Sequence, residues 1–367
     1  MSSERVRAAD AAATSGSAPQ AAEAPDQQPA EATATAPASR RFRIPDAVFR
    51  FQSYVGLVIV FVAAIVLSPE RGGETVFLRP ENLANVVRAV SEIGIIAVGM
   101  TFVILIGGID LSVGAILGLS AVGSAALLMR DDLPVAPTVG VVLCLGLVFG
   151  AVQGFTSARL RLQSFIVTLA GLQIARGLAR IWSGGQAIPL AYGDEPNLAP
   201  PVFGLLNSRI LGGTLPIPAL IFVAVGATAI FVLRRTTFAR HVYAIGGNER
   251  AARLSGVAVT RVKVTVFAVS GFLAAMAGII HAGQLNAGSP NDGSGYELDA
   301  IAAVVVGGTS LMGGVGKVGG TLAGALLLGI LNNILALNNI NANIQLLIKG
   351  VIIVAAAAVQ TFRSGTE

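Results

Sequence analysis

The chain has 367 residues, of which 54% are hydrophobic and only 12% are charged. Soluble domains carry about 25% charged residues, so this composition excludes an ordinary soluble fold and indicates a protein embedded in a lipid bilayer. The net charge of +5 is carried between apolar segments, without a compact basic face, so we expect no nucleic-acid partner. With one cysteine and two histidines in the chain, we also expect no internal disulfide and no bound metal.

The first 39 residues are rich in Ala, Ser, Thr, Pro and Gln. They contain no apolar run that could form a core or a signal-peptide segment, and their prolines oppose a continuous helix. We therefore interpret residues 1–39 as a disordered, dispensable tail. Residues 40–367 form the predicted transmembrane domain.

Ten apolar segments follow a cluster of arginines, and most approach the ~20 residues with which a helix crosses a bilayer. The segments cover residues 51–67, 91–106, 110–129, 135–155, 164–182, 216–233, 263–284, 297–309, 318–335 and 344–362. The eighth is short, and four glycines between residues 307 and 314 interrupt the chain after it, so it could be a broken or re-entrant helix. We predict an all-α, polytopic fold with about ten transmembrane helices, with nine as the alternative.

Basic residues orient the predicted helices. With the N-terminus inside, ten spans put the Arg-rich segment 234–263 on the cytoplasmic side, whereas the opposite loop 285–297 carries Asp292 and Glu297 without Lys or Arg. Three arginines after the first segment fall on the outside, but three glutamates accompany them. We therefore expect both termini to be cytoplasmic.

Four polar residues in or beside apolar segments are candidates for a solute pathway or gate. A charge on Asp110 would cost ~2.5 to 3.5 kcal/mol at the bilayer centre, so Asp110 must be paired, solvated or near an interface. It and Ser112 could line the pathway, or Asp110 could cap the following helix. Asn332 and Asn333 lie within the ninth apolar run, where an amide can serve solute hydroxyls or hydrogen-bond another helix equally well.

Small residues predict a site of close helix packing. Gly316, Gly320 and Gly324 recur every four residues, which would align them on one face of the ninth helix. Without side chains, that face allows another backbone to approach closely. We interpret this stripe as a packing surface and not as a ligand site.

The cytoplasmic segment of about 234–262 contains the signals of a short helix outside the membrane. Asn248 suits an N-cap, Glu249 suits the positive start of a helix, and Gly256 suits a left-handed residue after its end. These residues predict a helix of about two turns. An ordinary basic loop is the alternative.

This segment resembles the coupling region of permeases in the ribose-type family of ABC monosaccharide importers. Four of its residues match an E-x-A-A-x-x-x-G pattern, and stretches 99–114, 165–178 and 295–333 resemble the same family, so the resemblance spans about residues 83–362. Ser164 stands where family members have proline. The coupling residues that the resemblance implies are Asn248, Glu249, Arg250, Ala251, Ala252, Arg253, Leu254, Ser255 and Gly256.

The resemblance also implies partners. A permease homodimer in the bacterial inner membrane would work with a cytoplasmic ATPase, which uses ATP and Mg, and with an extracytoplasmic sugar-binding protein. The chain itself is expected to be neither an enzyme nor a cofactor binder, because Leu311 and Val318 break the phosphate-loop pattern around Gly316-Lys317. Which sugar is moved is not encoded here.

An ion-coupled secondary transporter of a small polar solute is the alternative function. Such a transporter needs ionisable groups or an ion cage within the membrane. In the sequence, Asp110 and Asp299 are the candidates for that role.

Overall fold

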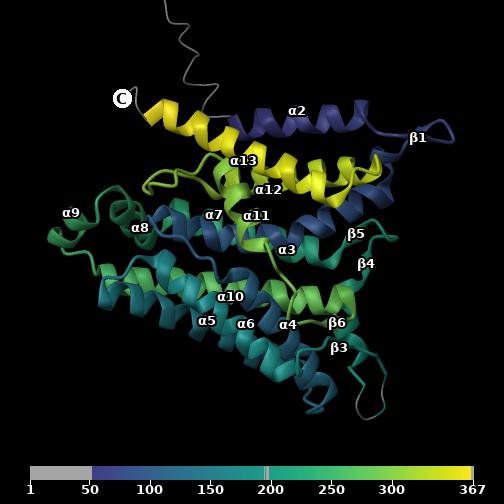
Figure 1. Cartoon of the computed structure of the whole chain (residues 1–367), viewed down its shortest axis with the longest axis horizontal. Helices are drawn as coiled ribbons and strands as arrows, with labels where there is room; N and C mark the ends of the chain where they lie inside the picture. The colour runs from purple at the N-terminus through teal and green to yellow at the C-terminus, as the bar shows by residue number, and fades with distance from the viewer. Residues whose placement is uncertain (1–51, 194, 196–197, 365–367) are drawn as a thin grey trace, which may run out of the picture. The chain divides into compact units, whose positions relative to one another are not determined.

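The computed structural model describes residues 52–193, 195 and 198–364, so the predicted tail 1–39 lies outside the described residues. The described chain is dominated by helices (Figure 1). The long helices are α2 (Gln52–Val66), α3 (Pro80–Leu105), α4 (Val113–Met129), α5 (Val135–Leu160), α6 (Ser164–Ser183), α7 (Ile217–Arg235), α10 (Val259–Leu285), α12 (Val318–Leu337) and α13 (Ala342–Ser364). Shorter helices are α8 (Thr237–Gly247), α9 (Glu249–Leu254), α11 (Tyr296–Val306) and the 3₁₀ helices η1 (Val76–Leu78) and η2 (Pro201–Asn207).

Each of the ten predicted apolar segments coincides with one of these helices. Among the described residues, six helices are long and apolar enough to cross a membrane, namely α3, α5, α6, α7, α10 and α12. The largest error in a boundary concerns α3, which begins at Pro80 and not near residue 91. Proline suits the first helical position and Glu81 suits the positive first turn, so polar residues extend this helix beyond its apolar part.

Strands are limited to three antiparallel pairs of two residues each within the described part of the chain. They are β1 (Glu70–Arg71) with β2 (Glu74–Thr75), β3 (Ile188–Pro189) with β6 (Ala287–Gly288), and β4 (Arg209–Ile210) with β5 (Leu215–Pro216). They lie at one end of the helices, and α8 and α9 lie at the other (Figure 1). The β3–β6 pair joins the chain after α6 to the chain after α10.

The most extensive contact between two helices joins α5 to α10 and includes glycines of both. A Cβ on Gly150 would overlap the carbonyl of Phe267, and Gly146 and Gly271 face each other in the same way. Because lipid provides little hydrophobic drive for association, such close backbone contact is what holds membrane helices together. In contrast, α2 and α13 expose apolar side chains that include Ile59 and Leu347, as lipid-facing or partner-facing helices do.

The predicted glycine stripe is only partly on a helix. Gly320 and Gly324 lie in α12, where the carbonyls of Gly307 and Ala303 occupy the space of their missing side chains. Gly316 precedes the first residue of α12, so its prediction on the same helix face was wrong. It lies instead against the side chain of Thr309.

The chain between α10 and α11 is not helical, although it lies inside the protein. Gly288 lies against Ala121 near the middle of α4, and Gly293 lies against Gly114 in the first turn of that helix. This segment, residues 286–295, begins with strand β6, continues in turns and runs along the first half of α4 before α11 begins. At about 16 Å, α11 is too short to cross the ~30 Å hydrocarbon layer alone. The predicted broken helix thus has non-helical chain before it as well as glycine-rich chain after it.

Candidate translocation and coupling sites

Asp110 lies between α3 and α4 with its side chain fully buried. One oxygen accepts hydrogen bonds from the backbone N–H (3.0 Å) and hydroxyl (2.6 Å) of Ser112, and the other accepts from the hydroxyl of Ser270 at 2.8 Å. Gln153 of α5 donates to the Ser112 hydroxyl at 2.9 Å. Asp110 does not cap α4 as one alternative required, because Ser112 is the N-cap residue and Asp110 bonds to it rather than to the first turn. The cluster ties α5 and α10 to the start of α4.

The two neighbouring asparagines of α12 have different surroundings. Asn333 exchanges two hydrogen bonds with Asn82 of α3, at 2.9 and 3.1 Å. Asn332 lines a cavity of about 420 Å³ between α3, α12 and α13, and its buried Oδ1 has no donor within the described part of the chain. Asn333 therefore acts between helices, whereas Asn332 faces the cavity.

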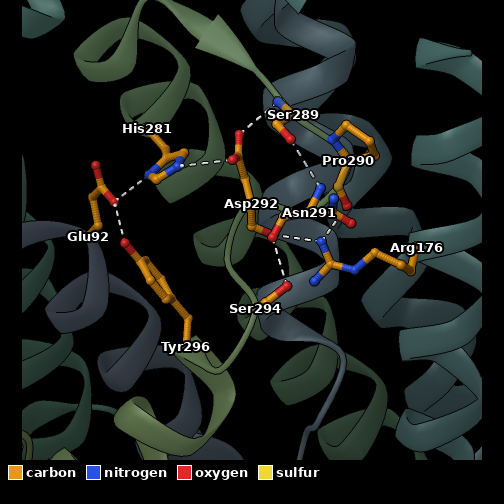
Figure 2. A network of polar contacts seen from close by, with 9 residues as sticks. All are labelled: Glu92, Arg176, His281, Ser289, Pro290, Asn291, Asp292, Ser294 and Tyr296. Atoms are coloured by element: carbon orange, nitrogen blue, oxygen red, sulfur yellow. Dashed lines mark hydrogen bonds and ion pairs between the residues drawn. The ribbon is translucent and has the colours of Figure 1, made fainter. Parts of the chain in front are cut away.

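A buried network of ionisable side chains surrounds segment 286–295 (Figure 2). His281 of α10 contacts Glu92 of α3 through Nδ1 at 2.7 Å and faces Asp292 through Nε2 at 3.7 Å. The hydroxyl of Tyr296 donates to Glu92 at 3.4 Å, and the backbone N–H of Ser289 donates to Asp292 at 2.8 Å. Glu92 and His281 are only 5% and 7% exposed. The network thus joins α3, α10 and α11 across segment 286–295.

Arg176 of α6 reaches the same segment from its other side. Its guanidinium donates to the backbone carbonyls of Pro290 and Asp292, the latter at 2.8 Å (Figure 2). Turns inside a membrane protein leave carbonyls without regular partners, and unsatisfied groups there cost several kcal/mol. Arg176 supplies the missing donors and so stabilises this non-helical chain inside the protein.

Sequence reasoning missed Glu92, Arg176, His281 and Tyr296 as site residues. The signal was present, because the first three are ionisable residues inside predicted apolar segments. Among the described residues, no group of three His, Cys, Asp or Glu side chains forms a potential metal site.

The capped helix predicted in segment 234–262 is confirmed as α9. The side chain of Asn248 accepts from the backbone N–H of Ala251 at 2.9 Å, and Gly256 has a φ of +84°. Sequence reasoning missed α8, which precedes it. The signal for α8 was the N-cap Thr236 and the spacing of its buried residues, Ala239, Val242 and Ile245.

Glu249 bonds to Lys263 at 2.7 Å and to Arg253 at 3.0 Å. Partial burial alone would raise the pKa of the Glu249 carboxyl, but the hydrogen bonds and charges of these two partners outweigh it and lower the pKa below its ordinary value. Glu249 and Arg253 also line a cavity of about 560 Å³ that extends to Ile109, next to Asp110. The backbone N–H of Ile109 donates at 3.1 Å to the hydroxyl of Ser164, the first residue of α6, where proline was expected.

A glycine junction connects α8 to the ends of two interior helices. A Cβ on Gly246 would overlap the carbonyl of Leu105, at the end of α3, and the backbone of Gly314, in the loop after α11. The N–H of Gly314 donates to that same Leu105 carbonyl at 2.9 Å, and the hydroxyl of Tyr243 donates to the Gly316 carbonyl at 2.9 Å. The segment that contains α8 is therefore in direct contact with the chain that ends α3 and follows α11.

Comparison with known proteins identifies the family. Residues 82–357 match the family described as the permease component of branched-chain amino acid transport systems. The chain belongs to this permease family. As a permease component it is a multi-pass transport subunit and not an enzyme, in agreement with the sequence-based prediction.

Curated relatives of this permease cover most of its length. The ribose import permease protein of Haemophilus influenzae is 41% identical over 88% of this chain and 96% of its own. That of Bacillus subtilis is 40% identical over 85% and 92%. The L-arabinose transport system permease protein of Escherichia coli is 37% identical over 84% and 89%. No solved structure matches the chain.

Proposed function

We propose that this permease forms the translocation pathway of an ABC importer for a monosaccharide or a related polyol, in a bacterial inner membrane. The observation that carries the proposal is the near-complete coverage of relatives named as ribose, xylose and arabinose permeases. The description of the family names branched-chain amino acids, but relatives that match most of this chain are named for sugars and favour a sugar.

The proposed topology has ten spans with both termini in the cytoplasm. Support comes from the helix found at each predicted segment and from three shorter apolar helices beside the six long ones. Segment 286–295 together with α11 counts as one broken span. In this topology α8 and α9 are cytoplasmic, in agreement with their arginines.

The proposed complex contains two copies of the permease, a cytoplasmic ATPase that uses ATP and Mg, and an extracytoplasmic sugar-binding protein. In this complex α9 and its flanks contact the ATPase through Asn248, Glu249, Arg250, Ala251, Ala252, Arg253, Leu254, Ser255 and Gly256. Leu254 supports this role because an apolar side chain outside the membrane is 84% exposed there. The glycine junction offers a route from α9, through α8, to the interior helices.

Asp110 and Ser112 are proposed to act at a gate, and Asn332 and Asn333 to lie along the pathway. The cavity that joins Ile109 to Glu249 supports the first assignment, because it brings the gate beside the coupling segment. The cavity beside Asn332 supports the second.

An ion-coupled transporter remains the second candidate, because a specific observation favours it. The contact of Glu92 with His281 and Asp292 provides buried ionisable groups of the kind that ion coupling requires. Family membership favours the ABC importer, and one experiment separates the two.

The test uses the permease reconstituted in vesicles with its ATPase and binding protein. The E249R variant places a positive charge at the start of α9, and G256V opposes a left-handed backbone, so both should lower sugar-dependent ATPase activity and uptake by roughly tenfold or more. The matched controls E249Q and G256N should retain more activity, because they keep the size of the side chain or tolerate the backbone conformation. Permease abundance is held equal.

Wild-type activity in both E249R and G256V would contradict the coupling role. Uptake driven by an ion gradient without the ATPase would establish the ion-coupled alternative instead.

A further inference from the structure

The cavity beside Asn332 has an unusual composition for the interior of a membrane protein. It measures about 420 Å³, which lies within the range of small-molecule sites, and α3, α11, α12 and α13 all contribute to it. Its polar lining consists of Asn85, Asn332, Asn333, Gln345, Asp299 and Lys349. The rest is apolar, including Val90 and Leu328. Polar groups on four helices thus converge on one space.

The opposite charges of the ion pair in this cavity largely cancel each other. Lys349 Nζ lies 3.1 Å from each oxygen of Asp299, and the two side chains are 17% and 20% exposed. An ammonium group has three N–H donors, so one remains for a ligand after both oxygens are served. A space bounded by this pair and by amides offers donors and acceptors without a net charge.

Asn332 contributes an acceptor that the protein leaves unused. Its Oδ1 is buried and has no donor among the described residues. An unpaired buried acceptor costs about 1 to 3 kcal/mol, a cost that a ligand hydroxyl in the cavity would remove. The wall opposite is α13, whose outer side exposes Ile344, Leu346 and Leu347 and whose contact with the remaining helices is limited to one face.

We propose that this cavity is a subsite for a neutral polyhydroxylated solute, whose hydroxyls donate to Asn332 and Asp299 and accept from Lys349. The proposal rests on the proposed function, and it names where within the permease the sugar is held. Because its charges largely cancel, the ion pair suits an uncharged solute. An amino acid would have to separate Lys349 from Asp299 in order to pair with each of them.

The first test is protection of a cysteine in the full complex. In a C144S background, A336C puts a thiol in the cavity lining, and A342C puts one at the exposed start of α13 as a matched control. D-ribose, D-xylose and L-arabinose are added at up to about 100 mM, which fills a site with a Kd of about 1 mM. We expect at least one sugar to slow maleimide labelling of A336C by roughly threefold or more, as occupancy above two thirds requires, and to leave A342C unchanged.

Equal labelling of A336C with and without every sugar would overturn the proposal, provided that the same vesicles import sugar. Protection by L-leucine instead of the sugars would also overturn it. If the wild-type complex imports none of these sugars, the proposed function fails, and this outcome is distinct from failure of the subsite.

The second test is transport by N332A, for which folding is not expected to suffer because the amide oxygen has no partner to lose. At saturating sugar-loaded binding protein, maximal uptake should fall roughly three- to tenfold, the loss of about one hydrogen bond. The ratio of ribose to arabinose uptake should change as well, which a merely structural role would not produce. Unchanged maximal uptake and an unchanged ratio would overturn the role of Asn332.

Discussion

Two regions of the permease hold their helices together by opposite means. Between α5 and α10, glycines bring backbone against backbone, and Gly150 leaves no room for even a methyl group beside Phe267. Where α3 meets α10, the side chains of Glu92 and His281 join the helices, and a polar cavity remains beside Asn332. The comparison suggests a division between a rigid frame and an interior that can rearrange, because polar partners can be exchanged whereas touching backbones cannot.

The largest expected effect falls in the α5–α10 region. The G150L variant should lose roughly 3 kcal/mol or more of unfolding free energy, because its side chain meets backbone atoms that cannot turn away. G140L on the same helix is the matched control, since nothing lies within 4 Å of the position of its Cβ. Thermal unfolding in detergent and the yield of monodisperse protein measure both. Equal stability of the two variants would break the distinction between the regions.

The second-largest effect on stability is expected in the network around segment 286–295. E92L removes the acceptor of His281 and Tyr296, and leaving buried polar groups unpaired should cost about 3 kcal/mol. E81L makes the same substitution at an exposed position of α3 and should cost far less. The same unfolding measurement compares them. If E92L were as stable as E81L, the network would not stabilise segment 286–295.

The two asparagines of α12 provide a finer test within the polar region. N333A should lose about 1 kcal/mol or less, because hydrogen bonds between membrane helices contribute modestly. N332A should change stability by no more than about 0.5 kcal/mol. If N332A proved the more destabilising of the two, Asn332 would have a structural partner and the cavity would need another interpretation.

The smallest effect is expected at the surface pair of α9, which serves as a reference for both interior regions. The pKa of Glu249 is lower in the folded protein than its ordinary value of about 4.3, so its pairs stabilise the fold above that pH and lose this contribution as pH falls through the folded-state pKa. E249Q should therefore be less stable than wild type at pH 7 by less than about 1 kcal/mol, since exposed pairs are screened. The difference should vanish in acid. A difference that grew towards acid pH would contradict this sign.

Much of the fold could be predicted because its main signal is local. A run of apolar residues near the thickness of a bilayer marks a helix wherever it occurs, and the ten predicted segments all contain one. The start of α3 was wrong because Asn82 and Arg88 are polar, although they lie in a helix that continues from Pro80. For the same reason α8 was missed, since its buried face is only three residues wide.

The interior site could not be predicted in the same way because it depends on distant pairs. Glu92 and His281 meet across the fold, and no local pattern in one sequence relates them. Asn332 and Asn333 differ only by about 100° of rotation around α12, so only the packing of that helix decides which of them pairs with Asn82 and which keeps an unpaired oxygen in the cavity. The capped ends of α9, in contrast, involve neighbours in the chain and were predictable.

The contact at Gly246 determines how far a displacement of α8 and α9 can reach. Side chains absorb small shifts by changing rotamer, but Gly246 meets Leu105 and Gly314 through backbone atoms alone. At this point no side chain can change its rotamer to absorb a shift of α8 towards the interior. The end of α3 and the chain after α11 must therefore move together with α8. A single methyl group added at Gly246 would alter the spacing between these three segments.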